Sequence, residues 1–202
     1  MGINTGRLGF LANNPVNEIY KGLTYLLNNQ FSIEKRSILK LDTETNLFGD
    51  DNFALNDFTI HKRDNSSLAA ITAYLNGEFF NTYWGDGIIV ATPTGSTAYS
   101  MSCGGPIVFP EAKNFIITPV APHNLNVRPV IVPENVIISF EIKGRDRSYL
   151  ISLDSRYKIV DQSFKLKISK ADFMLSTIRF NDQNFSQIIR EKLSWGVDNR
   201  NI

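Results

Sequence analysis

The chain has 202 residues, of which 43% are hydrophobic and 20% are charged, a composition typical of a globular protein. Its formal net charge of +1 disfavours both nucleic acid and an anionic membrane surface as partners. A single cysteine, Cys103, excludes an intrachain disulfide and a cysteine zinc site, and two histidines are too few to favour a histidine metal cluster.

Targeting signals are not evident in the sequence. No stretch reaches the roughly 18 apolar residues of a membrane span, and the first residues lack the basic-then-apolar pattern of a signal peptide. We therefore expect a cytoplasmic protein with no metal, nucleic acid or membrane partner.

The periodicity of apolar residues predicts a mainly β fold with a helix near each end. Residues 15–29 and a segment from about residue 184 show helical spacing. Between them, short apolar runs predict strands, and Asn76-Gly77 predicts a type I′ hairpin turn within residues 67–84. Further strands are expected at 58–62, 88–91, 115–120, 130–132, 136–143, 149–153, 164–169 and 173–178.

The run from residue 85 to 106 stands out, because a short apolar strand enters TPTGSTAYS at 92–100 and then GGP at 104–106. Ser96 or Thr97 is expected to cap a helix over residues 96–103 that the glycines end. Backbone N–H groups and exposed hydroxyls at such a helix start suit a ligand with phosphate or ribose groups. An ordinary capped helix in a β protein is an equally good interpretation.

A second polar pair, Asn56-Asp57, stands at the start of a predicted strand and could bind sugar hydroxyls or a purine edge. Taken alone, it is more simply a turn, where Asn and Asp are common. The same holds for Asp154 at the end of a strand, and His123 lies in a proline-rich connection where a structural role is the simpler one.

Taken together, these segments resemble the NAD kinase family. The resemblance rests on GINTGRLGFL at 2–11, ALND at 54–57, DG at 86–87 followed by the 92–106 run, TPVAPHNLNVRP at 118–129, and WG at 195–196. It implies the β-sandwich-like C-terminal lobe of a two-lobe α/β plus β kinase. Residues 1–34 would be the edge of the N-terminal lobe, 35–180 the NAD-binding domain, and 181–202 a C-terminal helix and tail.

The resemblance also implies an activity. Family members phosphorylate the 2′-hydroxyl of the adenosine ribose of NAD to give NADP, using ATP or polyphosphate with Mg²⁺, and assemble as dimers or tetramers. No tightly bound cofactor is expected. Two alternatives remain open: a non-catalytic dinucleotide-binding or oligomerisation domain, and a related lipid kinase, which the polar 92–99 run disfavours.

The resemblance assigns site roles by position. Asn56 and Asp57 would meet ribose hydroxyls or adenine, and Asp86 the nicotinamide carboxamide. The remaining assignments are Thr97, Ala98 and Tyr99 to a base pocket, Ser96 and Ser100 as weaker contacts, and Ala121 and His123 to a neighbouring subunit's ligand.

The family's GGDGT segment, which carries the expected catalytic base, is not found in the 202 residues. No catalytic residue is therefore assigned here, and we expect this chain, as a truncated form, to bind dinucleotide without phosphorylating it, since phosphoryl transfer depends on positioning and charge stabilisation. Asp57 stands where the family more often has Glu, and Ser155 where Gly often follows Asp154.

Overall fold

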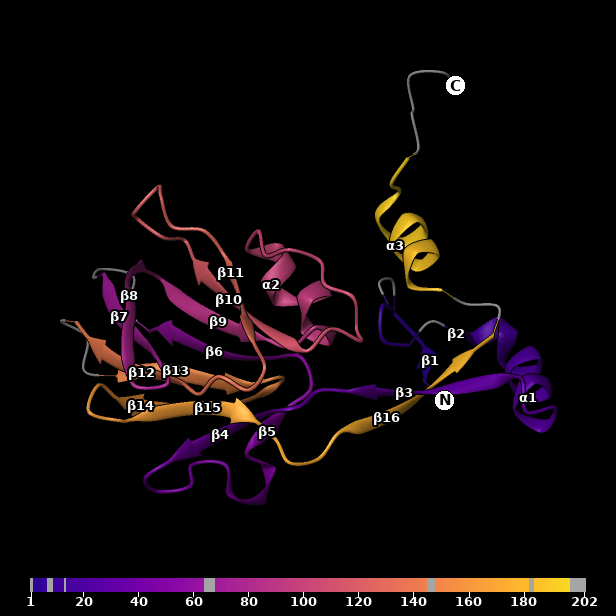
Figure 1. Cartoon of the computed structure of the whole chain (residues 1–202), viewed down its shortest axis with the longest axis horizontal. Helices are drawn as coiled ribbons and strands as arrows, with labels where there is room; N and C mark the ends of the chain where they lie inside the picture. Colours follow the sequence, from indigo (N-terminus) through magenta and orange to yellow (C-terminus); the bar gives the residue numbers. More distant parts are fainter. Residues whose placement is uncertain are drawn as a thin grey trace. The chain divides into compact units, whose positions relative to one another are not determined.

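The structure is a computed structural model that describes residues 2–6, 9–12, 14–63, 68–144, 148–181 and 184–196 (Figure 1). The chain divides into two compact units, one formed by Arg36–Leu175 and the other by Met1–Lys35 with Ser176–Ile202. Within the described residues, no helix is long and apolar enough to cross a bilayer.

The larger unit is a sandwich of two sheets whose neighbouring strands pair antiparallel. The first sheet runs β11 (Val130–Pro133), β10 (Asn114–Val120), β9 (Gly87–Ala91), β6 (Asp57–Lys62), β13 (Ser148–Leu153) and β14 (Arg156–Asp161). The second sheet runs β5 (Phe53–Ala54), β4 (Leu39–Thr43), β15 (Leu166–Lys170), β12 (Ile138–Lys143), β7 (Ala69–Leu75) and β8 (Glu78–Gly85). The predicted mainly β fold is confirmed.

The core lies between the two sheets. Side chains alternate along each strand, so Ile88 and Val90 of β9 pack into the main core, together with Phe58 of β6 and Phe140 of β12. The rings of Phe58 and Phe140 stack across the sandwich with centroids 6.1 Å apart. Each such buried side chain stabilises the fold by about 1.5–3 kcal/mol, so the inner faces of both sheets are fixed.

The outer face of the first sheet is covered over only part of its width. Ile89 and Ile116, which point away from the main core, form a smaller cluster with Val108 and the partly buried Cys103. Val108 and Cys103 belong to the segment 92–112, which also contains a 3-10 helix and a short α-helix. β9 and β10 are therefore covered on both faces, and β6 and β13 are left with an open polar face.

The covering segment is not the single capped helix that the sequence predicts. It contains a 3-10 helix (Thr94–Thr97) and a four-residue helix, α2 (Tyr99–Ser102), separated at Ala98, whose φ of −102° and ψ of −131° are not helical. No side chain caps either helix, so the expected cap by Ser96 or Thr97 is wrong. Gly104, with φ of +81°, follows the end of α2 as predicted.

Local signals account well for the hairpin and poorly for the edge strands. Asn76 and Gly77 have φ of +52° and +85°, as a type I′ turn requires, and they join β7 to β8. β14, which the sequence analysis did not predict, is an edge strand with most of its side chains exposed. A 3-10 helix (Gly49–Asp51) occupies the place of the turn between β4 and β5.

The smaller unit contains the two predicted terminal helices. α1 (Ile19–Leu27) follows a 3-10 helix (Val16–Glu18), and α3 (Phe185–Leu193) begins after Asn184, whose side chain accepts a hydrogen bond from the Gln187 amide at 2.7 Å. Its strands are β1 (Ile3–Asn4), β2 (Asn14–Pro15), β3 (Phe31–Arg36) and β16 (Leu175–Phe180). β1 pairs with β2, and β3 pairs with β16.

Candidate functional site

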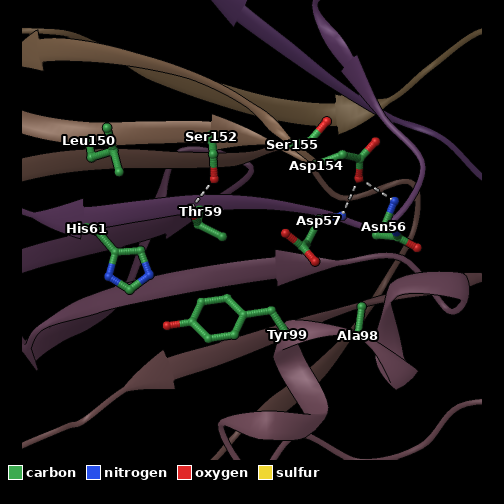
Figure 2. A pocket seen from close by; sticks show the side chains of 10 residues that line it. All are labelled: Asn56, Asp57, Thr59, His61, Ala98, Tyr99, Leu150, Ser152, Asp154 and Ser155. Carbon is green, nitrogen blue, oxygen red and sulfur yellow. Dashed lines mark hydrogen bonds between the residues drawn. The ribbon is translucent and has the colours of Figure 1, made fainter. Parts of the chain in front are cut away.

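The uncovered half of the first sheet forms a groove of about 630 Å³ (Figure 2). Because side chains alternate, Asp57, Thr59 and His61 of β6 face the groove, while the residues between them face the core. The register pairs Thr59 with Ser152 of β13, and their hydroxyls are 2.5 Å apart. The groove is lined by Asn56, Asp57, Thr59, His61, Ala98, Tyr99, Leu150, Ser152, Asp154 and Ser155.

Asp154 fixes the backbone that carries Asn56 and Asp57. Its carboxylate accepts hydrogen bonds from the amides of Leu55 at 2.9 Å, Asn56 at 2.7 Å and Asp57 at 3.2 Å. Asp154 has a φ of +52°, which Asp tolerates better than most residues. Charge-assisted bonds of this kind are stronger than neutral ones, so the turn at 55–57 is set from the far end of β13.

The covering segment fixes the same turn from the other side. The Thr92 hydroxyl donates to the Leu55 carbonyl at 2.5 Å, and the Thr92 amide donates to the Asn56 carbonyl at 2.9 Å. Gly95 packs so closely that a Cβ there would lie 2.0 Å from the Asn56 carbonyl oxygen. The Thr92–Gly95 part of the motif therefore serves to hold Asn56 in place.

Asp57 is the most perturbed acidic group of the groove. Its residue is 6% exposed, and burial, together with the charge of Asp154, raises the pKa of Asp57 to about 7. The Asp154 carboxylate is stabilised by its three amide donors and lies 3.9 Å from the Arg156 guanidinium. With its pKa at about 7, Asp57 exchanges a proton near neutral pH.

The predicted site residues fall into three places. The groove is lined by two of the predicted pairs, Asn56-Asp57 and Ala98-Tyr99 (Figure 2). The two pairs are about forty positions apart in the sequence. This is the part of the predicted site that the structure brings into one cavity.

A second group lies where β8 meets β9. The Asp86 amide donates to the Val120 carbonyl at 3.0 Å, and the His123 amide donates to the Trp84 carbonyl at 2.8 Å. These bonds hold the exposed loop with Ala121 and His123 beside Asp86. The Asp86 carboxylate lies 2.6 Å from the Lys62 ammonium, and none of these three predicted residues is in the groove lining.

A third group is inside the covering segment. Ser96 and Ser100 are fully buried: Ser96 bonds to the backbone of Val108 and Ser100 pairs with the Thr118 hydroxyl at 2.8 Å. Thr97 donates to the Thr94 carbonyl at 3.3 Å. The expectation that these serines present exposed hydroxyls at a helix start is wrong, because the 3-10 helix directs Ser96 inward and α2 directs Ser100 inward; their contact with a ligand stays a prediction.

Sequence reasoning missed Thr59, His61, Ser152 and the anchoring role of Asp154. The alternation of polar and apolar residues in 57–62 and 149–154 was the available signal, since it indicates strands with one face on the core and a polar face away from it. The sequence near each strand does not show which two strands become neighbours in the sheet.

The groove combines three kinds of chemistry. Tyr99 and Ala98 offer an aromatic and apolar wall for a flat ring, Asn56 and Asp57 offer amide and carboxyl groups for hydroxyls, and the Thr59–Ser152 pair adds hydroxyls on its floor. An apolar wall combined with fixed polar groups is typical of small-molecule sites. The described residues gather no group of three or more His, Cys, Asp and Glu side chains that could hold a metal ion.

Comparison with known proteins gives the family to which this chain and its fold belong. Residues 55–180 match the model of the ATP-NAD kinase C-terminal domain. The chain is 51% identical over 201 residues to the NAD kinase of Cytophaga hutchinsonii and 46% identical over 203 residues to that of Flavobacterium psychrophilum. In both cases all of the chain is covered, and 69% of the relative.

Solved structures agree. Yeast NADH kinase complexed with NADH superposes with a TM-score of 0.85 at 26% identity, covering 98% of this chain and 59% of the yeast chain. An Archaeoglobus fulgidus NAD kinase in complex with ATP gives 0.81 at 26% identity, covering 97% of this chain and 74% of that one. The chain belongs to the NAD kinase family and contains its C-terminal domain.

Proposed function

We propose that the groove is the dinucleotide site of an NAD kinase, an enzyme that transfers the terminal phosphoryl group of ATP, or of polyphosphate, to the 2′-hydroxyl of the adenosine ribose of NAD. The observation that carries the proposal is that Asn56 and Asp57 share one groove with Ala98 and Tyr99. Family membership supports it, as do relatives named NAD kinase and a neighbour complexed with NADH.

In this proposal each predicted site residue has a task that its chemistry suits. The Asp57 carboxyl and the Asn56 amide hydrogen-bond ribose hydroxyls or the adenine edge, and Tyr99 with Ala98 and Thr97 contacts the face of a base. Asp86 takes the nicotinamide carboxamide, while Ser96 and Ser100, which the free chain buries, are the weakest of the assignments. Mg²⁺ arrives on the phosphates of the donor, as is usual for this ion.

The catalytic base is proposed to lie outside these residues, in the family's GGDGT segment, which the 202 residues do not contain. We accordingly expect the isolated chain to bind NAD and to form no NADP. Incubation with NAD, ATP and Mg²⁺ tests this, and steady NADP production by the purified 202-residue chain would contradict it.

Calorimetric titration of NAD and NADP against the chain tests the binding proposal. We expect saturable binding that Asp57→Ala weakens by about tenfold to a hundredfold, since hydrogen bonds to a charged group contribute about 1.5–3 kcal/mol. Asp42→Ala is the matched control, because Asp42 lies on β4 in the other sheet and pairs with Lys40 at 3.1 Å. Equal affinities for wild type and Asp57→Ala would remove Asp57 from the site.

Two alternatives are separated by calorimetry together with an activity assay in which the family's first lobe is supplied. A non-catalytic dinucleotide-binding domain would bind NAD and stay inactive even when the family's first lobe is supplied. A lipid kinase would bind no NAD, and the carboxyl, amide and hydroxyl groups of the groove disfavour an acyl chain there.

Self-association is a further part of the proposal. The loop with Ala121 and His123 is exposed and is held beside Asp86 by backbone hydrogen bonds, which supports the proposal that it contacts another subunit's ligand. Light scattering is expected to give a dimer or tetramer, and the mass of one 22.8 kDa subunit at micromolar concentration would contradict it.

A further inference from the structure

His61 occupies one end of the groove, with Asn56 and Asp154 at the other (Figure 2). It lies on the groove face of β6, two residues beyond Thr59 and opposite Leu150 of β13. It is one of only two histidines in the chain, and none of the roles proposed above uses it.

The sheet makes room for the imidazole. On the other side of β6, His61 pairs with Gly87 of β9. A Cβ at Gly87 would lie 2.2 Å from the Ile60 carbonyl oxygen and 3.1 Å from His61 Nδ1. A side chain at position 87 is therefore excluded, and its absence leaves space in which the His61 ring can sit.

The imidazole uses that space to stack on Tyr99. The two ring centroids are 5.6 Å apart and the ring planes are inclined by 28°, within the range of favourable aromatic pairs. Tyr99 opens the four-residue helix α2 and is 39% exposed. Because the Tyr99 ring is only partly buried, its orientation depends on the groups that it contacts.

His61 is suited to contact an aromatic ring as an uncharged group. Burial lowers the pKa of His61, and the Asp86 carboxylate opposes that shift. Asp86 itself is engaged by the Lys62 ammonium at 2.6 Å, which reduces its pull on the imidazole. At neutral pH the imidazole is therefore predominantly neutral. An uncharged ring suits stacking on Tyr99 in a groove that also binds a base.

We propose that His61 is a positioning residue that holds the Tyr99 ring as a fixed wall, against which the flat base of the bound dinucleotide is oriented. The inference rests on the proposed function of the groove. His61 acts through Tyr99 and takes no part in phosphoryl transfer. The wall extends from His61 to Tyr99 and Ala98, and the polar corner at Asn56 and Asp57 binds the sugar.

The test compares His61→Ala with His61→Phe, which keeps a flat ring at this position. NAD affinity is measured by calorimetry. We expect His61→Ala to weaken NAD binding by about twofold to tenfold, the range of an aromatic pair, and His61→Phe to restore it to within about twofold of wild type. Phe79→Ala is the matched control, because it removes one ring of the Tyr74–Phe79 pair, whose residues do not line the groove.

A second readout follows the Tyr99 ring directly. In NMR spectra of protein labelled at tyrosine, the Tyr99 ring resonance, assigned with Tyr99→Phe, is expected to shift in His61→Ala and to return toward its wild-type position in His61→Phe. A histidine with only a structural role would lower the melting temperature without this recovery of ring position and affinity.

Each outcome decides the matter. If wild type binds NAD and His61→Ala binds it equally well, the inference is overturned and the proposed function stands. If His61→Phe fails to recover the affinity that His61→Ala loses, the aromatic contact is not the cause and the inference is also overturned. Should His61→Ala fail to fold, His61→Leu replaces it. A wild-type chain that binds no NAD overturns the proposed function and this inference together.

Discussion

The outer face of the first sheet has two halves that differ in what covers them. Over β9 and β10, the segment 92–112 packs down with apolar side chains, and the hydroxyls of Ser96 and Ser100 find partners inside the protein. Over β6 and β13, no described residue completes a second core, and the face carries Asp57, Thr59 and His61 around a groove. One sheet thus supports a closed, satisfied surface and an open, polar one side by side.

The comparison shows how a single motif serves both halves. Residues 92–100 supply Ser96 and Ser100 to the closed half and Ala98 and Tyr99 to the open half. The two roles alternate along the motif, because Ala98 and Tyr99 stand between Ser96 and Ser100. The motif is therefore a structural element as well as a binding element, and substitutions within it are expected to divide into two classes.

The largest effect is expected where the motif meets the open half. Gly95→Ala would place a Cβ 2.0 Å from the Asn56 carbonyl oxygen, a backbone atom that cannot move without breaking the turn at 55–57. We expect a loss of more than about 4 kcal/mol or no folded protein at all, measured by thermal unfolding.

Gly104→Ala is the control for this substitution. A Cβ at Gly104 meets nothing within 4 Å, although its φ is +81°, so only the backbone cost of about 1–2 kcal/mol applies. A Gly95→Ala protein as stable as Gly104→Ala would show that the close packing on Asn56 is not needed.

The second effect concerns charge in the open half. With a pKa of about 7, Asp57 holds its proton more tightly in the folded chain than in the unfolded one, where the value is 3.8. Its contribution to the free energy of unfolding therefore falls as the pH rises from about 4 to about 7. We expect Asp57→Asn to exceed wild type in stability at pH 8 by up to about 4 kcal/mol, while binding NAD less tightly.

Urea unfolding of both proteins at pH 5, 6, 7 and 8 measures this difference. The gain from Asp57→Asn should grow across the series and level off above about pH 7. Parallel profiles would mean that Asp57 is ionised throughout this range and that its burial does not perturb it.

The third effect is on the anchor of the groove. Asp154→Ala removes the acceptor of three backbone amides, and we expect a loss of about 2–3 kcal/mol, as for other hydrogen bonds to a charged group. It also removes the charge that, in addition to burial, raises the pKa of Asp57, so the pH dependence of stability should weaken. Stability and its pH dependence that both match wild type would exclude the anchoring role.

The sequence predicted the features that depend on neighbours in the chain. The Asn76-Gly77 turn needs two adjacent residues that adopt positive φ, and the strands around it alternate clearly. The Asn56-Asp57 and TPTGSTAYS segments were also predicted from adjacent residues, because their residue types alone suit a ligand. The family resemblance then gave the fold and linked these segments.

The features that the sequence did not predict depend on distant contacts. From the sequence alone, Asp154 is predicted to be a turn residue. Its anchoring role depends on β13 lying beside β6, where Asp154 binds the amide of Asp57, 97 positions away in the sequence. The sequence shows His61 only as a single histidine in a strand. Its stacking on Tyr99 depends on the position of α2 in the folded chain. β14 has little periodicity because, as an edge strand, it buries few of its side chains.

The smallest effect is expected in the closed half, where Ser100→Ala removes one hydroxyl of a fully buried pair with Thr118. Losing a neutral hydrogen bond and leaving its partner unpaired costs about 1–2 kcal/mol, which a thermal melt resolves. The informative measurement is the NAD dissociation constant. If the Ser100 hydroxyl acts only within the covering segment, this constant changes by less than about twofold, whereas a direct contact with the ligand would raise it by about fivefold to tenfold. Its pairing with Thr118 leads us to expect the first result. The second would mean that the covering segment opens when the dinucleotide binds, and that the division between the closed and open halves holds only for the free chain.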